Sequence, residues 1–377
     1  MKKTNIGKKI LKALGIILLV IVLLAVILVK VVPALLFTDY QGRPTTGEYH
    51  VAQSEAILID HDRIEAFETD GSFREVPVHF YFPEEIESIE ENSLPLVIFS
   101  HGAFGYYQSN SSTYMELASN GYVVVSLDHP YHSFFTKDSS GKTVIVDKNF
   151  FSTAMEIGKA DITEIEVYQI TSKWMELREA DMNFVLDTLI ASANSGNLGD
   201  EWFFAGAEKE HIAEVLRCTD TEKIGLMGHS LGGATAVTVG RRSDVSAVID
   251  FDGTMLGEEI GVENGKTLVN DEVYDTPLLC FDSESHHEDR EKARETGVVY
   301  ANNVVLDNST EGYSTYFVGA KHMDFTDLPL FSPFLANMLG SGDVNSEECI
   351  DQINEITLNF FNCYLKGNGE FTVNDKY

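Results

Sequence analysis

The chain has 377 residues and carries 59 acidic side chains against 27 basic ones, which gives a formal net charge of −32 at pH 7. A molecule this negative repels phosphate backbones, so its charge argues against nucleic acid as a partner and favours a solvated acidic surface. Its four cysteines show no paired metal-ligand spacing and are too few for a fold built on disulfides, although one bridge among Cys218, Cys349 and Cys363 stays open.

An apolar segment near the N-terminus predicts a membrane anchor. Residues 13–29 are uncharged and almost wholly apolar, and as a helix they would be about 25 Å long. Five lysines precede them, so the positive-inside rule places residues 1–9 in the cytoplasm, residues 10–37 across the cell membrane as a single span, and residues 38–377 outside as one globular domain. A cleaved signal peptide is the alternative, but the apolar run is longer than such peptides need and no clean cleavage site follows it.

The first part of the outer domain alternates strands with a helix. Stretches 56–60 and 76–82 read as antiparallel lead-in strands, and 94–100 as a buried strand. A helix over 112–120 then leads into another buried strand within 122–130. Strand, helix and strand in this order imply parallel strands joined by a right-handed crossover.

The middle of the chain mixes polar and helical segments. Residues 133–160 resemble an excursion over the top of the sheet, and 164–189 have the apolar spacing of a long helix that faces the sheet. Residues 198–216 form an insertion before the next strand. The sequence favours neither a cap over a pocket nor surface padding for this insertion.

An apolar strand over 223–228 runs into a tight turn at Ser230 and then into a helix of small residues. This is the Gly-x-Ser-x-Gly pattern of a nucleophile elbow, in which Gly228 and Gly232 allow close approach of neighbouring backbone and the serine hydroxyl stays exposed. The N-terminus of the following helix directs free N–H groups at the site, the first of them that of Leu231. The alternative is an ordinary strand-to-helix turn with a solvated serine.

A second turn of this kind follows the strand over 94–100. It reads His101-Gly102-Ala103, and the Ala103 N–H is placed to serve with the Leu231 N–H as the two donors of an oxyanion hole. An ordinary glycine turn is the alternative, since backbone donors require no particular side chain.

Further strands over 245–253, 276–282 and 313–318, with a closing helix over 348–365, predict a mostly parallel sheet. A serine nucleophile needs a base, and three histidines follow Ser230. His322 comes just after the last strand, where open α/β sheets gather reactive groups, whereas His286 and His287 stand in a charged stretch that we expect to be solvated.

Three aspartates are candidates for the acid that orients the base. Asp252 stands at the exit of its strand before a glycine and is favoured. Asp282, at the end of the next strand, is the second candidate. Asp250 is the third, because it lies about 6.6 Å further back along the strand than Asp252.

Taken together, these motifs resemble the platelet-activating factor acetylhydrolase-like group of α/β-hydrolases, which is related to cutinase-like and dienelactone-hydrolase-like esterases. The resemblance runs over most of residues 75–365 and rests on Phe99-Ser100-His101-Gly102, Glu116 to Tyr122, Gly228 to Thr235, and Gly319-x-x-His322-x-x-Phe325. It implies an α/β-hydrolase fold and a serine esterase with Ser230, His322 and Asp252 as the triad and Ala103 and Leu231 as the oxyanion donors. In cutinase-like relatives the acid follows the next strand, near Asp282.

The sequence thus predicts a membrane-anchored hydrolase of short-chain carboxylic esters or short-acyl phospholipids that needs no cofactor and no metal. Neither His-Glu-x-x-His nor a complete calcium loop is present in the sequence. A lipase or polyester hydrolase is the nearest alternative, and a catalytically silent surface binding protein is the alternative from another class. The oligomeric state stays open.

Overall fold

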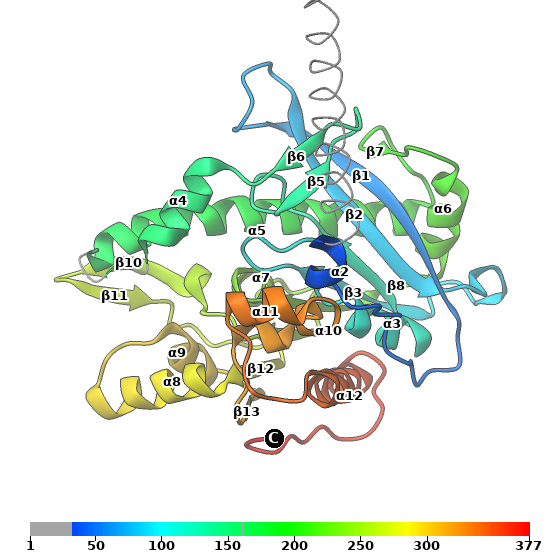
Figure 1. The fold of residues 1–377 in the computed structure, drawn as a ribbon. Helices are drawn as coiled ribbons and strands as arrows, with labels where there is room; N and C mark the ends of the chain where they lie inside the picture. Colours follow the sequence, from blue (N-terminus) through cyan, green and yellow to red (C-terminus); the bar gives the residue numbers. More distant parts are fainter. Residues whose placement is uncertain (1–31, 158, 160–161) are drawn as a thin grey trace, which may run out of the picture.

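A mixed sheet forms the centre of the domain in the computed structural model, which describes residues 32–157, 159 and 162–377 (Figure 1). From edge to edge its strands are β13 (Gly312–Phe317), β12 (Leu278–Ser283), β9 (Ala247–Phe251), β8 (Thr219–His229), β3 (Leu94–Ser100), β4 (Val123–Leu127), β2 (Phe73–Pro83), β1 (Val51–Ile64) and β7 (Trp202–Phe203). The six strands from β13 to β4 pair in parallel, and β2, β1 and β7 continue the sheet antiparallel. The predicted lead-in pair and the mostly parallel sheet are therefore confirmed.

Helices cover both faces of this sheet. On one face lie α5 (Glu164–Ser195), α6 (Glu208–Cys218), α7 (Leu231–Val239) and α9 (Ala301–Asp307), and on the other lie α3 (Ser111–Ser119) and α12 (Ser346–Tyr364). The central strands are buried on both faces by these layers, which explains why β3 and β4 consist almost entirely of apolar residues.

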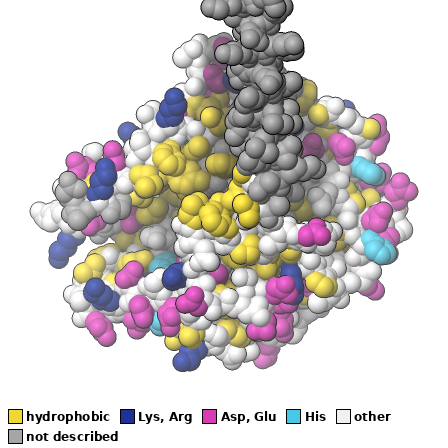
Figure 2. Space-filling view, in the orientation of Figure 1, with side chains coloured by type: hydrophobic (Ala, Val, Ile, Leu, Met, Phe, Trp, Pro, Cys, Tyr) yellow, Lys and Arg dark blue, Asp and Glu magenta, His cyan; other side chains and the backbone are white. Residues whose placement is uncertain are grey.

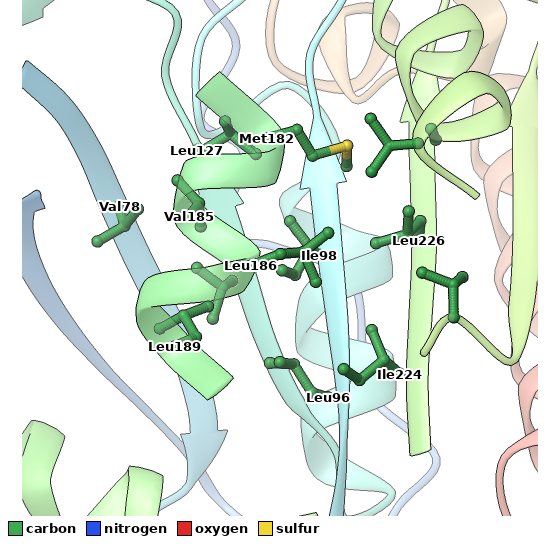
Figure 3. Close-up of a cluster of buried hydrophobic side chains, with 14 of the residues drawn as sticks. Val78, Leu96, Ile98, Leu127, Met182, Val185, Leu186, Leu189, Ile224 and Leu226 are labelled. Atoms are coloured by element: carbon green, nitrogen blue, oxygen red, sulfur yellow. The ribbon is translucent and has the colours of Figure 1, made fainter. Parts of the chain in front are cut away.

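Helix α5 is the longest helix of the described chain. Thr163 and Glu166 form a capping box at its start, and Gly196 ends it in a left-handed conformation with φ of 66°. Its apolar stripe packs directly on the sheet (Figure 3), where the α5 side chains Met182, Val185, Leu186 and Leu189 meet Val78, Leu96, Ile98, Leu127, Ile224 and Leu226. The predicted sheet-facing helix over 164–189 is present and extends six residues further.

The excursion over 133–160 contains a small hairpin of β5 (Phe135–Lys137) and β6 (Thr143–Ile145), followed by α4 (Lys148–Glu156). Another small hairpin, β10 (Glu259–Glu263) with β11 (Lys266–Val269), follows the turn η3 (Leu256–Glu258), and η2 (Ile86–Ser88) precedes β3. After the last strand come η4 (His322–Phe325), α10 (Leu328–Phe331) and α11 (Pro333–Leu339), and α8 (Glu284–Thr296) follows β12. Apolar side chains gather on the face of the molecule seen in Figure 2. The exposed apolar residues of α4 and α11 include Phe151, Met155, Phe334 and Met338.

Residues 198–216 extend the sheet at its far edge. Trp202 and Phe203 form β7, which pairs with Leu58 and Ile57 of β1, and α6 packs beside it. This edge lies opposite β12 and β13, so the insertion is separated by several strands from the end of β8 that carries Ser230.

The N-terminal segment and the cysteines complete the description. The predicted anchor lies outside the described residues except for its last part, where α2 (Val32–Leu36) begins. Among the residues that the structure describes, no helix is both long and apolar enough to cross a membrane. Cys218, Cys280, Cys349 and Cys363 are all free thiols, so the disulfide left open by the sequence does not form.

Candidate active site

Ser230 stands at the tip of the turn between β8 and α7. Its φ of 55° and ψ of −123° place it outside the regions that side chains normally allow, a strain on the order of 1–3 kcal/mol that surrounding structure must offset. Its N–H donates to the carbonyl of Phe251 at 2.9 Å, and its own carbonyl accepts the N–H of Ala234 at 3.0 Å as the helix begins. The strained serine is therefore fixed on both sides by backbone hydrogen bonds.

The glycines of the turn are required by close backbone contacts. A Cβ on Gly228 would lie 2.2 Å from the carbonyl oxygen of Gly232, and a Cβ on Gly232 would lie 2.0 Å from the carbonyl oxygen of Ser100. No side chain fits at either distance, so the Gly-x-Ser-x-Gly spacing follows from packing of β8, α7 and the end of β3 against one another.

His322 and Asp252 meet beside this turn. His322 is the first residue of η4, and its Nδ1 lies 2.7 Å from Oδ2 of Asp252, which directly follows β9. The Asp252 side chain is buried, whereas the His322 side chain is 43% exposed. Since β8 and β9 pair with His229 opposite Phe251, Ser230 and Asp252 leave the sheet side by side. The structure thus brings Ser230, Asp252 and His322 together at the carboxyl ends of the parallel strands.

Oδ1 of Asp252 has two further donors. It accepts the N–H of Ser283 at 2.6 Å and lies 3.1 Å from Nδ1 of His286. Burial by itself opposes ionisation of Asp252, but the hydrogen bonds from His286 and His322 outweigh it and hold the pKa of this carboxyl well below its usual range. Asp252 is consequently a carboxylate throughout the neutral pH range.

The expectation that His286 is solvated was wrong. Ser283 caps α8 by accepting the His286 N–H at 3.3 Å, and this helix start turns the imidazole inward, where only 9% of it is exposed. Burial disfavours its charge, yet the carboxylates of Asp252 and Asp282 raise the pKa of His286 above its usual value. The sequence signal was the Ser-x-x-His spacing of a helix cap after a strand, which also places His287 outward against Tyr316.

The other two acid candidates have different partners. Asp282 forms a buried ion pair with Arg290 and accepts the Ser314 hydroxyl at 3.2 Å. Asp250 accepts the N–H of Gly253 at 2.9 Å, and burial together with the charges of Asp282 and Asp252 raises its pKa well above the usual value. Neither carboxylate is hydrogen-bonded to His322.

Asp252, Asp282 and His286 also bring one potential metal-ligating atom each within 4.8 Å of one another. The carboxylate oxygens already accept hydrogen bonds from Ser283 and His322, and the guanidinium of Arg290 lies against Asp282. With a cation already paired there, the group is better described as a hydrogen-bonded network than as a metal centre.

The His101-Gly102-Ala103 turn lies against the nucleophile. A Cβ on Gly102 would approach Cβ of Ser230 to 3.1 Å, so the turn and the serine are in direct contact. Within the described part of the chain, neither the Ala103 N–H nor the Leu231 N–H has an acceptor. Two free backbone donors therefore flank Ser230, one from the turn after β3 and one from the first residue of α7.

This arrangement, with a serine at a strained strand-to-helix turn and an aspartate and a histidine after later parallel strands, defines an α/β-hydrolase. The solved structure of a ferulic acid esterase from Streptomyces cinnamoneus has the same fold, with a TM-score of 0.58 and 18% sequence identity over 87% of this chain and 94% of that chain.

The chain belongs to the family of platelet-activating factor acetylhydrolase, isoform II, whose family model matches residues 73–376. It is 23% identical to the platelet-activating factor acetylhydrolase of Gallus gallus over 291 residues, and this alignment covers 74% of this chain and 63% of that protein. It is 22% identical over 177 residues to a probable 1-alkyl-2-acetylglycerophosphocholine esterase of Arthroderma benhamiae, which covers 47% of this chain and 35% of that protein. The chain thus spans less than two thirds of the length of these relatives.

Proposed function

We propose that the chain is a serine hydrolase of carboxylic esters in which Ser230, His322 and Asp252 form the catalytic triad. The observation that carries the proposal is the 2.7 Å contact between His322 Nδ1 and Asp252 Oδ2, at the carboxyl ends of the strands where Ser230 occupies a strained turn. Family membership and the esterase names of the relatives support the same reaction class.

The proposed reaction follows from the arrangement of these three side chains and the two backbone donors. Ser230 Oγ attacks the ester carbonyl while His322 Nε2 takes its proton, and the N–H groups of Ala103 and Leu231 stabilise the oxyanion. His322 then protonates the departing alcohol, which leaves an acyl-enzyme. A water molecule that gives its proton to His322 attacks the acyl carbon, and the acid and free Ser230 result. Asp252, with its lowered pKa, stays ionised and stabilises the imidazolium formed in each step.

The proposed substrates are short-chain carboxylic esters, including phospholipids with a short acyl group. Apolar side chains lie directly behind both oxyanion donors, because Ala103 and Leu231 belong to one packed cluster with Phe104, Phe150 and Trp174. The ring centroids of Phe104 and Phe150, and those of Phe150 and Trp174, are 5.1 Å apart. The packing of these aromatic side chains with both oxyanion donors supports a short acyl chain in the proposed substrate.

The proposed location is the outer face of the cell membrane, with residues 10–37 as a single-pass anchor and the N-terminus in the cytoplasm. The apolar run over 13–29 and the lysines before it support this orientation. Added protease should degrade the domain in intact cells, and alkaline carbonate should leave the chain in the membrane fraction. Release of the chain by carbonate would contradict the anchor.

Hydrolysis of 4-nitrophenyl esters from acetyl to dodecanoyl, by the full chain in detergent, tests the activity. Ser230→Ala should lower kcat by about 10⁶-fold. Ser152→Ala, which removes an exposed hydroxyl on α4, should leave kcat unchanged. If the folded parent chain turns over no ester and no fluorophosphonate labels Ser230, the hydrolase proposal fails and the silent binding domain takes its place.

A further inference from the structure

Arg178 is a fully buried arginine in the middle of α5, and it points at the turn that carries Ala103. Its Nη1 donates to the carbonyl oxygen of His101, and its Nη2 donates to the carbonyl oxygen of Gly102 at 3.2 Å. Its Nε lies 3.4 Å from Nδ1 of His132. One guanidinium therefore holds two consecutive carbonyl groups of the turn that flanks Ser230.

The carbonyl of Gly102 has two more donors. His101 Nδ1 lies 2.6 Å from this oxygen, and the N–H of Gly105 donates to it at 3.1 Å. The backbone N–H of His129 donates to Nε2 of His101 at 3.2 Å, so Nε2 is an acceptor and the ring proton sits on Nδ1. Burial, followed by the nearby charge of Arg178, keeps the pKa of His101 well below its usual value, and the ring is neutral.

The peptide group between Gly102 and Ala103 contains both the held carbonyl and the proposed oxyanion donor. A trans peptide directs its C=O and its N–H in opposite directions. We propose that Arg178, assisted by His101, is a positioning residue that holds this peptide with its carbonyl toward α5 and its N–H toward the ester oxygen. This inference rests on the proposed function, and it names the element that keeps the oxyanion hole open.

The charge of Arg178 strengthens the argument. In the described ranges no carboxylate forms an ion pair with it, and the nearby Asp181 is already bound by Arg74 at 2.6 Å, by Arg63 at 2.9 Å and by His129 at 2.9 Å. Burying a charged group is costly unless dipoles or charges compensate, and the acceptors that Arg178 directly contacts are the two carbonyl groups and, at 3.4 Å, Nδ1 of His132. A flip of the Gly102–Ala103 peptide would remove one of them and would turn a carbonyl oxygen toward the oxyanion position.

The guanidinium of Arg178 also polarises the Gly102–Ala103 peptide bond. A positive group on the carbonyl side of the Gly102–Ala103 peptide polarises that amide and makes its N–H a stronger donor to developing negative charge. Positioning and polarisation both act on the transition state more than on the bound ester, so loss of Arg178 should lower kcat and leave KM nearly unchanged.

The test compares 4-nitrophenyl acetate with its thiono analogue in the full chain. Sulfur accepts hydrogen bonds poorly, so an intact oxyanion hole favours the oxygen ester over the thionoester. Arg178→Met should lower kcat for the oxygen ester by about 10²-fold, near the lower end of the range for loss of one oxyanion donor, and Arg178→Lys by roughly 10-fold. In both variants the preference for oxygen over sulfur should shrink.

Arg74→Lys is the matched control, because Arg74 is an equally buried arginine of the same network that does not contact the turn. It should lower the midpoint of urea unfolding and leave the preference for the oxygen ester intact. Arg178→Lys keeps the charge and the aliphatic stem, so it tests the proposal even if Arg178→Met does not fold.

Suppose that Ser230→Ala is inactive but a folded Arg178 variant keeps the preference of the parent chain for the oxygen ester. That result would overturn the positioning role of Arg178 and leave the proposed triad in place. Full activity of Ser230→Ala would instead overturn the proposed function. The two failures are therefore distinguished by the same set of proteins.

Discussion

Replacing Asp252 by asparagine tests which carboxylate orients His322. Asp252 accepts two donors on Oδ1, from Ser283 and His286, and one on Oδ2, from His322. The amide of asparagine has one oxygen and one NH2 group, and the oxygen accepts from the two donors on the Oδ1 side. The amide NH2 then faces Nδ1 of His322, which must become an acceptor. The ring proton moves to Nε2, and this tautomer is unable to take the proton of Ser230.

The expected loss is that of a triad with its histidine in the wrong tautomer. This corresponds to a fall in kcat of about 10⁴, or about 5.4 kcal/mol in the activation barrier at 25 °C. KM should change little, because the Asp252 side chain is buried and therefore does not contact the bound ester. The change in kcat is measured with 4-nitrophenyl acetate, and the unfolding midpoint in urea is measured in parallel.

Asp282→Asn and Asp250→Asn are the matched controls on the neighbouring strands. Asp282→Asn weakens the buried ion pair with Arg290 and should destabilise the fold by about 3 kcal/mol while kcat stays within about tenfold of the parent. Asp250→Asn should have a small effect on both quantities, because burial and the neighbouring carboxylates raise the pKa of Asp250 and so favour its neutral form, which asparagine resembles. If Asp252→Asn keeps kcat within tenfold of the parent, or if Asp282→Asn shows the 10⁴-fold loss, the assignment of the acid is refuted.

Three further predictions concern packing and pH. Gly232→Ala places a Cβ 2.0 Å from the carbonyl oxygen of Ser100, the last residue of β3. The free energy of unfolding, measured in urea, should therefore fall by about 1–3 kcal/mol, and fluorophosphonate labelling of Ser230 should slow. Unchanged values of both would refute the packing argument. Burial and the neighbouring carboxylates of Glu258 and Glu176 raise the pKa of Glu179 to about 7, so its charge costs stability as pH rises from about 4.5 to about 7. Glu179→Gln should add about 1–2 kcal/mol at pH 8 and nothing at pH 4, and the exposed Glu355→Gln on α12 is the control that should show no such difference. Because the pKa of His286 is raised in the folded state, this residue stabilises the fold fully below about pH 6.5 and less as pH rises through the folded pKa. The free energy of unfolding should fall over that range by up to about 1.4 kcal/mol per pH unit. His286→Gln should remove this dependence, and His287→Gln should retain it.

Much of the fold was predictable because its elements carry strong local patterns. The buried strands β3 and β4 are short apolar runs, as is the second half of β8, and the apolar stripe of α5 has helical spacing over several turns. The position of residues 198–216 was not predictable. Pairing of Trp202 with Leu58 joins residues that are far apart in the sequence, and no local pattern reports such a contact.

The candidate site was predictable to the extent that it depends on topology. Ser230, Asp252 and His322 each follow the end of a parallel strand, and the order of such strand ends is visible in the sequence. Arg178 and His286 were missed because their roles depend on direction. His286 stands in a highly charged stretch, which is why the sequence predicts a solvated side chain there. Arg178 stands among the apolar residues of α5, and no local pattern indicates that it points at a distant turn.

The choice among the three acids shows what spacing cannot supply. Asp250, Asp252 and Asp282 lie within two neighbouring strands, and three buried carboxylates this close cannot all stay ionised without compensation. Each has a different compensation, since Asp282 is paired with Arg290, burial and the neighbouring carboxylates raise the pKa of Asp250 and so favour its neutral form, and Asp252 accepts hydrogen bonds from two imidazoles. A carboxylate that is neutralised by an arginine or by a proton has little negative charge left to stabilise an imidazolium. Asp252 is thus the one of the three that is hydrogen-bonded to His322, and this contact, more than its place in the strand, makes it the acid of the proposed triad.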